Sequence, residues 1–547
     1  VLLVDSLKLT PLTAHSANLI VSESSLDAES KAVMPIREIK RLLAPRGTAM
    51  LLAHGDEKSL ESTLKSRIRR GGVKPADDQI LKFSSSSPSA SARDSAWIAL
   101  AGPVADGAGD WSHAYGAADN SAYGNETLSG VTKRDDLAVQ WIGRPGPRYQ
   151  ADRSGRKPPP LSTGGRVYLQ GLYRIVAVDN HNGTVLWSVE LPHFERMNMP
   201  RDCSNWCADE DHLFAAIRDR CWKIDAQTGE VKQQFATLVD DLPGDRYEWG
   251  YIASVDDLVI GSSVRPGSSS NDFWGGEGWY DGIGGDAVKK VCSDRLFALD
   301  KSTGKPQWTH EGTVVLNSTI TAGKDRVWFV ECRHPAVLGA EERRVGAKEL
   351  YDSLHLVALD VKTGEMIWEK PLEIVTPDVA LSLAYSNGRL VLVGSNAASK
   401  SFHVYNFAAD DGYSVWNRAV GWGKGTNDHG THLSRPAIVG SRLVVRPAVM
   451  NLANGDLSDS QMPVSGCGTY SCTSAAMFFR AWSGQDFAMW DFEKGDYTRW
   501  TRLRPDCWLS SIPADGLLLA PEGGGGCSCG KWLETSMAFI PRSRLAE

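Results

Sequence analysis

The most regular feature of the chain is a short apolar run that ends in Asp, followed by a Thr-Gly turn and a second run that carries Trp. The Asp side chain can accept N–H groups of the turn, and Gly supplies a backbone with positive φ. Each copy therefore predicts a β-hairpin. Clear copies lie at 175–187, 296–308 and 356–368, a fourth at 221–229, a shortened one at 411–416, and weaker ones at 451–455 and 491–500.

A Trp follows the turn Gly by four residues in four copies, and the copy at 221–229 has Gln233 in its place. A Trp at a fixed point of every unit can fill the gap between neighbouring sheets, which is how a radial array of sheets buries its faces. Seven recognisable turns, plus one unit closed by pairing of the two ends of the array, predict a propeller of seven or eight blades.

These units resemble the PQQ-like (pyrroloquinoline-quinone-like) repeat family, which includes quinoprotein alcohol dehydrogenases and cofactor-free propellers of envelope assembly. The resemblance spans about residues 110–540 and implies a mainly β fold, with a PQQ-like β-propeller over 110–547. In the family this repeat element is structural and does not contact the quinone. The resemblance therefore predicts the fold and leaves cofactor binding open.

Residues 1–75 follow a different pattern. Apolar runs at 1–4, 17–22 and 48–53 indicate buried strands, and between 26 and 43 the apolar residues fall on one helical face. Pro45-Arg46-Gly47 is expected to end that helix. Strand, helix and strand at this spacing predict an α/β unit with a parallel sheet.

The segments 17–23 and 36–47 resemble the later half of a class I S-adenosylmethionine-dependent methyltransferase, in which a strand is followed by a helix and a glycine-containing turn. Arg46 stands where the family has the first Gly of that turn. The family's Gly-rich cofactor loop and ribose-binding acid have no counterpart in this chain, so we expect the truncated, Rossmann-like segment to be inert as a methyltransferase. The combination of this segment with a propeller resembles exported proteins of planctomycete-type bacteria.

Residues 76–109 separate the two parts. They contain a Ser-rich run at 84–91 and a Gly-containing run at 105–109, with few large apolar side chains between them. This composition predicts a mobile Ser/Gly-rich linker.

Composition and charge narrow the picture only slightly. The 547 residues carry a formal charge of −7 with both signs interspersed, which argues against a nucleic-acid partner. The sequence shows nothing near the roughly 18 consecutive apolar residues of a membrane span. Because the chain begins at Val1 within a predicted strand, we expect it to be a fragment, so that a missing targeting signal is uninformative.

The ten cysteines favour disulfides or buried thiols, and with them a periplasmic or extracellular location. Structural zinc is the alternative, but the close pairs have C-x3-C, C-x4-C and C-x-C spacing instead of paired C-x-x-C motifs. Cys467 and Cys472 flank a turn that a disulfide could bridge.

Two segments near the carboxyl end contain the candidate cofactor-binding residues. Cys527 and Cys529, followed by Trp532, lie in a loop with four consecutive glycines, and could bind a soft metal, form a strained disulfide or stack on a planar ligand. Arg504 and Glu522 could hold an anionic ligand such as a quinone carboxylate. The structural alternatives are disulfides that join the last blades and salt bridges between blades.

His429 and His432 lie in a Gly-bounded loop with Asp428 and could supply metal ligands or a general base. The alternative is that these histidines serve as hydrogen-bonding residues of a propeller loop. No catalytic residue can be assigned from the sequence.

The pattern as a whole favours an extracytoplasmic binding or scaffold protein, whose ligand could be a protein, a glycan or a small molecule. The alternative is a quinoprotein dehydrogenase that oxidises an alcohol or sugar with PQQ and Ca²⁺ in the central funnel. The two differ in whether Arg504, Glu522, Trp532 and the Cys527/Cys529 loop converge around the propeller axis.

Overall fold

The computed structural model describes most of the chain, and all structural statements below concern these residues. The described residues are 10–22, 34–54, 66, 81–84, 95–143, 159–171, 173–191, 204–238, 247–269, 282–423, 430–464, 468–481, 486–501, 509, 511–521 and 535–546.

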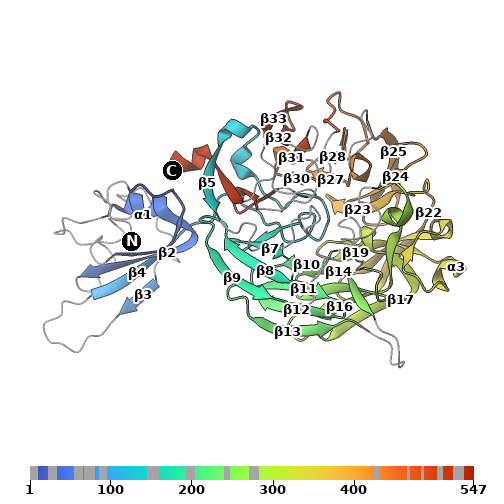
Figure 1. The fold of residues 1–547 in the computed structure, drawn as a ribbon, viewed down its shortest axis with the longest axis horizontal. Coiled ribbons are helices and arrows are strands. Elements are labelled where there is room, and N and C mark those ends of the chain that lie inside the picture. The colour runs from blue at the N-terminus through green and yellow to red at the C-terminus, as the bar shows by residue number, and fades with distance from the viewer. Residues whose placement is uncertain are drawn as a thin grey trace.

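The described part of the propeller contains eight blades, arranged radially (Figure 1). The first is β6 (Leu161–Thr163), β7 (Arg166–Gly171), β8 (Arg174–Asp179) and β9 (Val185–Glu190). The second is β10 (Trp206–Ala208), β11 (His212–Ile217), β12 (Arg220–Asp225) and β13 (Val231–Ala236). The third is β14 (Glu248–Val255), β15 (Leu258–Val264), β16 (Lys290–Asp300) and β17 (Pro306–Leu316). The fourth is β18 (Thr321–Ala322), β19 (Arg326–Cys332), β21 (Leu354–Asp360) and β22 (Met366–Leu372).

The remaining blades continue the same antiparallel order. The fifth is β23 (Ala380–Ser386), β24 (Arg389–Asn396), β25 (Ser401–Ala408) and β26 (Ser414–Gly421). The sixth is β27 (Ala437–Val439), β28 (Arg442–Val445) and β29 (Ala448–Asn451). The seventh is β30 (Ser471–Cys472), β31 (Ala476–Ala481), β32 (Asp486–Asp491) and β33 (Asp496–Thr501). The eighth is β34 (Ile512–Ala514), β35 (Leu517–Ala520), β36 (Ser536–Pro541) and β5 (Leu137–Gly143).

The eighth blade closes the ring, because its outermost strand β5 comes from the start of the propeller while its other three strands come from the end of the chain. The innermost strands of the eighth and first blades, β34 and β6, are in contact, so the array is continuous. Pairing of the two ends was predicted from the repeats, and the eight blades fall within the predicted range.

The turns have the chemistry that the repeat predicts. The Asp300 carboxylate accepts the N–H groups of Ser302 at 3.1 Å and Thr303 at 2.7 Å, and Gly304 has a φ of +72°. The hydroxyl groups of Ser302 and Thr303 also donate to Asp300, and these bonds lower the pKa of Asp300 to about 2. The same carboxylate-to-turn bonds occur at Asp179, Asp225, Asp360 and Asp491.

At five of the blade interfaces a repeat Trp joins one blade to the next. Trp308 is 7% exposed, its indole N–H donates to the carbonyl of Val361 at 2.8 Å, and its ring lies against Gly364 in the turn of the fourth blade. The indole N–H groups of four other repeat Trp residues donate to the equivalent carbonyl, one residue after the position of the turn Asp in the next blade. They are Trp141, Trp187, Trp368 and Trp416.

Two of these interfaces differ from the simple repeat. Trp141 on β5 docks on the first blade at Gly183, although no turn precedes it, because β5 belongs to the closing blade. In the second blade Gln233 replaces the Trp, and Phe235 covers Gly304 instead. Gln233 donates to the carbonyl of Thr303 at 2.9 Å, so this interface keeps a hydrogen bond without the indole.

Close packing at the turns gives a first testable prediction. Gly364 and Gly388 have almost the same φ, +71° and +70°, but a Cβ at 364 would lie 2.5 Å from the Trp308 ring, whereas a Cβ at 388 would meet nothing within 4 Å. Gly388→Ala should cost only backbone strain, about 1 kcal/mol. Gly364→Ala should lower the free energy of unfolding by about 2 kcal/mol more, as overpacking does. Equal losses in urea unfolding would show that the indole does not pack tightly on this turn.

The N-terminal part is a four-stranded module beside the propeller (Figure 1). β1 (Ala17–Ser22) pairs in parallel with β2 (Leu43–His54), and α1 (Ile36–Leu42) lies between them in sequence. This confirms the predicted strand–helix–strand unit. The helix is shorter and β2 longer than predicted, because the chain enters β2 directly after Leu42. The predicted strand at 1–4 lies outside the described residues.

Two further strands lie within 76–109, the range predicted to be a linker. β4 (Ser95–Ala101) pairs antiparallel with β2, and β3 (Leu81–Ser84) pairs antiparallel with β4. The apolar run at 95–101 supplies a strand that the overall Ser/Gly composition of the segment obscured. The sheet is therefore mixed, and its relation to a methyltransferase is not supported by any finding. The domain boundaries stay a prediction.

The helical elements are short. They are α1, α3 (Pro335–Leu338) and the 3-10 turns η2 (Leu128–Gly130), η3 (Arg134–Asp136), η5 (Gly285–Val288), η6 (Asn317–Thr319), η7 (Lys348–Tyr351), η8 (Thr431–Leu433) and η9 (Arg542–Ala546). Two-residue β20 (Arg344–Val345) pairs with β16. Within the described residues, no helix has the length and apolar character of a membrane span.

The described cysteines are buried free thiols, namely Cys207, Cys221, Cys292, Cys332 and Cys472. The predicted disulfide between Cys467 and Cys472 is wrong, because Cys472 is a free thiol in the short inner strand β30, with no exposed surface. Burial raises the pKa of the Cys472 thiol. Of the two alternatives that the cysteine count left open, the described residues show the buried thiols.

Candidate functional site: a chain segment that closes the central channel

Residues 109–126, between β4 and β5, make one circuit around the propeller axis, and we call this segment the axial ring. Its backbone or side chains bond to every one of the eight blades, in chain order. Most contacts fall at the carboxyl ends of the innermost strands: Ala208, Ala322 and Cys472 are the last residues of β10, β18 and β30.

The axial ring contacts the eighth blade first, then the first to the seventh blades in order, and finally the eighth blade again. The bonds are Asp515 N–H to Gly109 O, Trp111 and Ser162 with each other, Ala208 N–H to Ser112 O, Ser254 N–H to His113 Nε2, Ala322 N–H to Ala118 O, Tyr385 N–H to Asp119 O, Ile438 N–H to Ser121 O, Cys472 N–H to Ala122 O, and Gly516 N–H to Glu126 Oε2, all between 2.8 and 3.1 Å.

The circuit is closed by bonds between its two ends. The N–H of Asp110 donates to Gly124 O at 3.1 Å. Glu126 has no exposed surface, and its carboxylate accepts N–H groups from Gly109 at 2.9 Å, Leu128 at 2.6 Å and Gly516 at 2.8 Å. One buried side chain therefore joins the start of the axial ring, its end and the eighth blade.

Glycine is required where the two ends of the axial ring meet. A Cβ on Gly124 would lie 1.8 Å from the Asp110 carbonyl oxygen, and a Cβ on Gly109 would lie 2.1 Å from the Gly124 carbonyl oxygen. Both contacts are with backbone, which cannot move aside as a flexible side chain can. Gly109 and Gly124 are therefore a signal of the axial ring in the sequence, but they follow no regular spacing that would make the signal recognisable.

The axial ring borders a small cavity in the channel. Its lining comes from the axial ring and from four blades, and consists of His113, Ala114, Tyr115, Asn120, Ser204, Tyr251, Ile252, Asn317, Ser318, Ile320 and Arg435. The cavity has a volume of about 20 Å³, enough for a water molecule. Sites for cofactor-sized ligands usually have about 300–1,000 Å³.

Arg435 brings a positive charge to this cavity. Its guanidinium carbon lies 3.8 Å from the centre of the Tyr115 ring, and the residue is 6% exposed. The Tyr470 hydroxyl donates to the Arg435 carbonyl and so holds the backbone there. A guanidinium over an aromatic face is a favourable pair, and here it ties the sixth blade to the axial ring.

His113 is a neutral side chain in the wall of the cavity, and both of its ring nitrogens have hydrogen-bond partners. Its Nε2 accepts the Ser254 N–H at 3.1 Å, so the proton must be on Nδ1, which lies 2.7 Å from Ser112 Oγ. Burial, followed by the charge of Lys301, lowers the pKa of His113 to about 3. The imidazole is therefore a structural bond to the third blade and does not act as a base at neutral pH.

The lowered pKa of His113 predicts a pH dependence of stability. Below pH 6.5 the unfolded chain binds a proton at this position and the native chain does not, so stability is lost as the pH falls. His113→Gln removes that proton binding. The stability difference between wild type and His113→Gln should narrow by about 2.5 kcal/mol from pH 7 to pH 4.5. Urea unfolding measures it, and a constant difference would contradict a neutral, buried imidazole.

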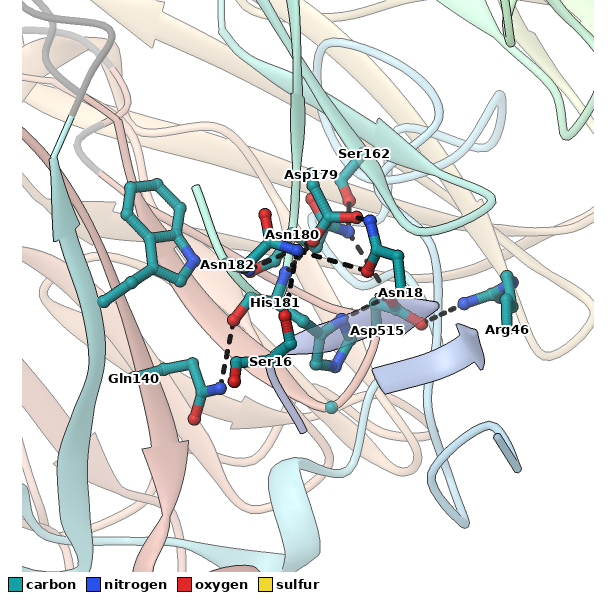
Figure 2. A network of polar contacts seen from close by, with 12 residues as sticks. Ser16, Asn18, Arg46, Gln140, Ser162, Asp179, Asn180, His181, Asn182 and Asp515 are labelled. Carbon is teal, nitrogen blue, oxygen red and sulfur yellow. Dashed lines mark hydrogen bonds and ion pairs between the residues drawn. The ribbon is translucent and has the colours of Figure 1, made fainter. Parts of the chain in front are cut away.

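A second polar cluster joins the module to the first and eighth blades (Figure 2). Asp515, in the turn after β34, lies at its centre and is 2% exposed. Arg46 donates to one Asp515 oxygen at 2.5 Å, and His181 Nδ1 lies 3.4 Å from the other. Burial lowers the pKa of His181 to about 4, so the imidazole beside Asp515 is neutral at pH 7. Arg46 has a φ of +62° within β2, where the resembling family has Gly.

The turn of the first blade completes this junction. Asn18 on β1 donates to Asp179 at 2.8 Å, and Asn182 donates to Ser16 O at 3.2 Å (Figure 2). Gln140 on β5 donates to Ala14 O at 2.7 Å. The module is therefore attached to the same turn that receives Trp141, and its position is coupled to the closing blade.

Of the residues proposed from the sequence, one lies in the described part of the chain. His432 belongs to η8, is 4% exposed, and its ring centre lies 5.5 Å from that of Trp422. The described residues contain no group of three or more His, Cys, Asp or Glu that could hold a metal ion. The other candidates lie outside the described residues and stay predictions. They are His429, Arg504, Glu522, Cys527, Cys529 and Trp532.

Comparison with known proteins agrees with this architecture. Residues 284–448 match the family described as "Outer membrane protein assembly factor BamB". The fold resembles quinohemoprotein alcohol dehydrogenase ADHIIG from Pseudomonas putida HK5, at 11% identity, and the enzyme from Comamonas testosteroni, at 12%. Each comparison covers 79% of this chain and 80% of the other, with a TM-score of 0.51. A search of curated protein sequences found no match.

These findings establish the class of fold. Residues 284–448 carry PQQ-type repeats of the BamB-like kind, and the chain folds as a mainly β propeller similar to those of the two quinohemoprotein dehydrogenases. At this level of identity the likeness concerns the fold alone.

The described cavity beside the axial ring is too small to hold PQQ. The cavity beside the axial ring is more than tenfold smaller than a usual cofactor site, and Arg435 is stacked on Tyr115 within it. Calcium takes six to eight oxygen ligands, mostly from carboxylates and carbonyls, and the described residues offer no cluster of carboxylates for it.

Proposed function

We propose that this chain is an extracytoplasmic binding or scaffold protein, and that its propeller serves as a rigid platform for a partner. The observation that carries the proposal is the axial ring, which bonds to all eight blades and leaves about 20 Å³ in the adjoining channel. A channel filled by its own chain supports a role in which the propeller presents its outer surfaces and loops.

The BamB-like repeats support the same proposal, because the matching family is described as an outer membrane protein assembly factor. A role in binding other proteins outside the cytoplasm is consistent with that description. The attached module adds a second surface at a fixed position, since Arg46, Asn18 and Ser16 bond to the first and eighth blades.

The competing proposal is a quinoprotein dehydrogenase, which the fold of the two dehydrogenases favours. Its site would be built from Arg504, Glu522, Cys527, Cys529 and Trp532, in loops outside the described residues.

The test is a calorimetric titration of PQQ, with Ca²⁺ present, into the full chain, followed by a dye-linked alcohol oxidation assay. The scaffold proposal predicts no saturable heat and no turnover. Stoichiometric binding that Trp532→Ala abolishes, while the exposed Lys324→Ala leaves it unchanged, would overturn the proposal in favour of the dehydrogenase.

A further inference from the structure

A second cavity, which we call the cleft, lies between the module and the propeller, outside the central channel. Its volume is about 270 Å³, and its walls come from the loop before β1, from α1 and β2, from the connector at 103–106, and from η2 and η9. Binding cavities occur preferentially at boundaries between structural units. A ligand here would touch both the module and the closing blade.

Positive charge dominates the lining of this cleft. Lys40 and Arg544 are permanently charged at neutral pH, His15 adds an imidazole, and Asp106 is the one carboxylate among the lining residues that are described. Lys40 is exposed on α1, whereas Arg544 is 7% exposed and is anchored by its donation to Gly516 O at 2.8 Å. The cleft thus combines one fixed and one mobile cation.

Cationic residues also lie near the neighbouring cluster. His181 lies in the first-blade turn, and the pKa of its imidazole is lowered mainly by burial; the Asp515 carboxylate raises it, and Arg544, His15 and Arg46 lower it further. His15 Nε2 lies 3.3 Å from Arg544 O, which fixes the imidazole next to the arginine. Several cations from both units therefore converge on one region.

We propose that this cleft binds a small dianion, of the phosphate-ester or dicarboxylate class, held by Lys40 and Arg544 between the module and the propeller. A guanidinium presents several N–H donors to carboxylate or phosphate oxygens, and an ammonium adds a point charge that can adjust its position. The apolar wall, with Leu43 buried and Val104 43% exposed, suits the carbon part of such a ligand. The proposal does not rest on the proposed function.

Calorimetric titration of the full chain with inorganic phosphate and with succinate, at low ionic strength, tests this proposal. At least one of them should bind with 1:1 stoichiometry, and the preferred one identifies the class of dianion. Lys40→Ala should weaken binding about tenfold, as loss of one charged contact does. Lys324→Ala, in an exposed turn of the fourth blade, should leave affinity unchanged.

A matched pair of variants at the cleft wall separates charge from shape. Val104→Glu places a carboxylate beside the ligand and should abolish binding, whereas Val104→Gln has the same size and should keep affinity within about threefold. Because Val104 is 43% exposed, both variants should fold. Binding that survives Lys40→Ala and Val104→Glu, or no binding of either anion, would overturn the proposal.

Discussion

Replacing Glu126 with Gln is expected to lower the free energy of unfolding by about 4 kcal/mol. The buried carboxylate accepts three backbone N–H groups, from Gly109, Leu128 and Gly516. The amide oxygen of Gln can still accept the N–H groups of Gly109 and Gly516, but its NH₂ group then faces the N–H of Leu128, and both of these donors are left without an acceptor. Each buried N–H left without an acceptor costs about 1–3 kcal/mol.

Urea unfolding of Glu126→Gln and of Glu493→Gln measures this effect with a matched control. Glu493 is exposed in the turn of the seventh blade, so its neutralisation should change stability by at most about 0.5 kcal/mol. Similar losses in the two variants would mean that the carboxylate does not close the axial ring.

Replacing Trp308 with Ala is expected to lower the free energy of unfolding by about 4 kcal/mol, because large buried aromatic residues cost about 3–5 kcal/mol when truncated. The ring fills the space between the third and fourth blades and covers Gly364, and its N–H donates to Val361 O at 2.8 Å. The loss should also loosen the boundary between these two blades.

Trp308→Phe separates the two contributions of the indole. Phe keeps an aromatic ring against Gly364 but loses the N–H, so about 2 kcal/mol should be lost instead of about 4. Equilibrium unfolding gives the totals, and limited proteolysis shows whether cleavage begins at this boundary. A Phe variant as unstable as the Ala variant would contradict packing as the main contribution.

The repeat hairpins could be predicted because their determinants are local. Asp300, Thr303 and Gly304 lie within five residues and satisfy one another's hydrogen bonds and backbone geometry. The docking of Trp308 was predictable as well, since it recurs at a constant offset. Trp141 was missed because it lies in the closing blade without a preceding turn, and only pairing between β5 and β36 places it against the first blade.

The axial ring could not be predicted from the pattern of apolar residues. Its bonds join positions hundreds of residues apart, such as Ala122 to Cys472 and Gly109 to Asp515, and they use backbone groups that every sequence has. Gly109 and Gly124 were visible in the sequence, but short contacts across a closed circuit are not encoded by spacing. The segment was therefore assigned to a linker and to the start of the propeller.

Arg46 departs from the pattern of the resembling family, and the structure shows what this side chain contacts. In the sequence it stood where the resembling methyltransferase family has the first Gly of a turn. In the structure it adopts the left-handed φ of +62° and reaches Asp515 in the eighth blade. The cofactor candidates are a different case, because Arg504, Cys527 and Trp532 lie outside the described residues and stay untested.

Hydrogen exchange of the segment 109–126, followed by mass spectrometry, tests the central claim most directly, namely that the chain closes its own channel. Amides of Asp110, Trp111 and Ala122 donate to backbone carbonyls within the propeller and the axial ring. We predict that this segment exchanges as slowly as the innermost strands, and that Glu126→Gln accelerates its exchange. Exchange as fast as that of an exposed loop in the wild-type chain would contradict the axial ring and reopen the channel to a cofactor.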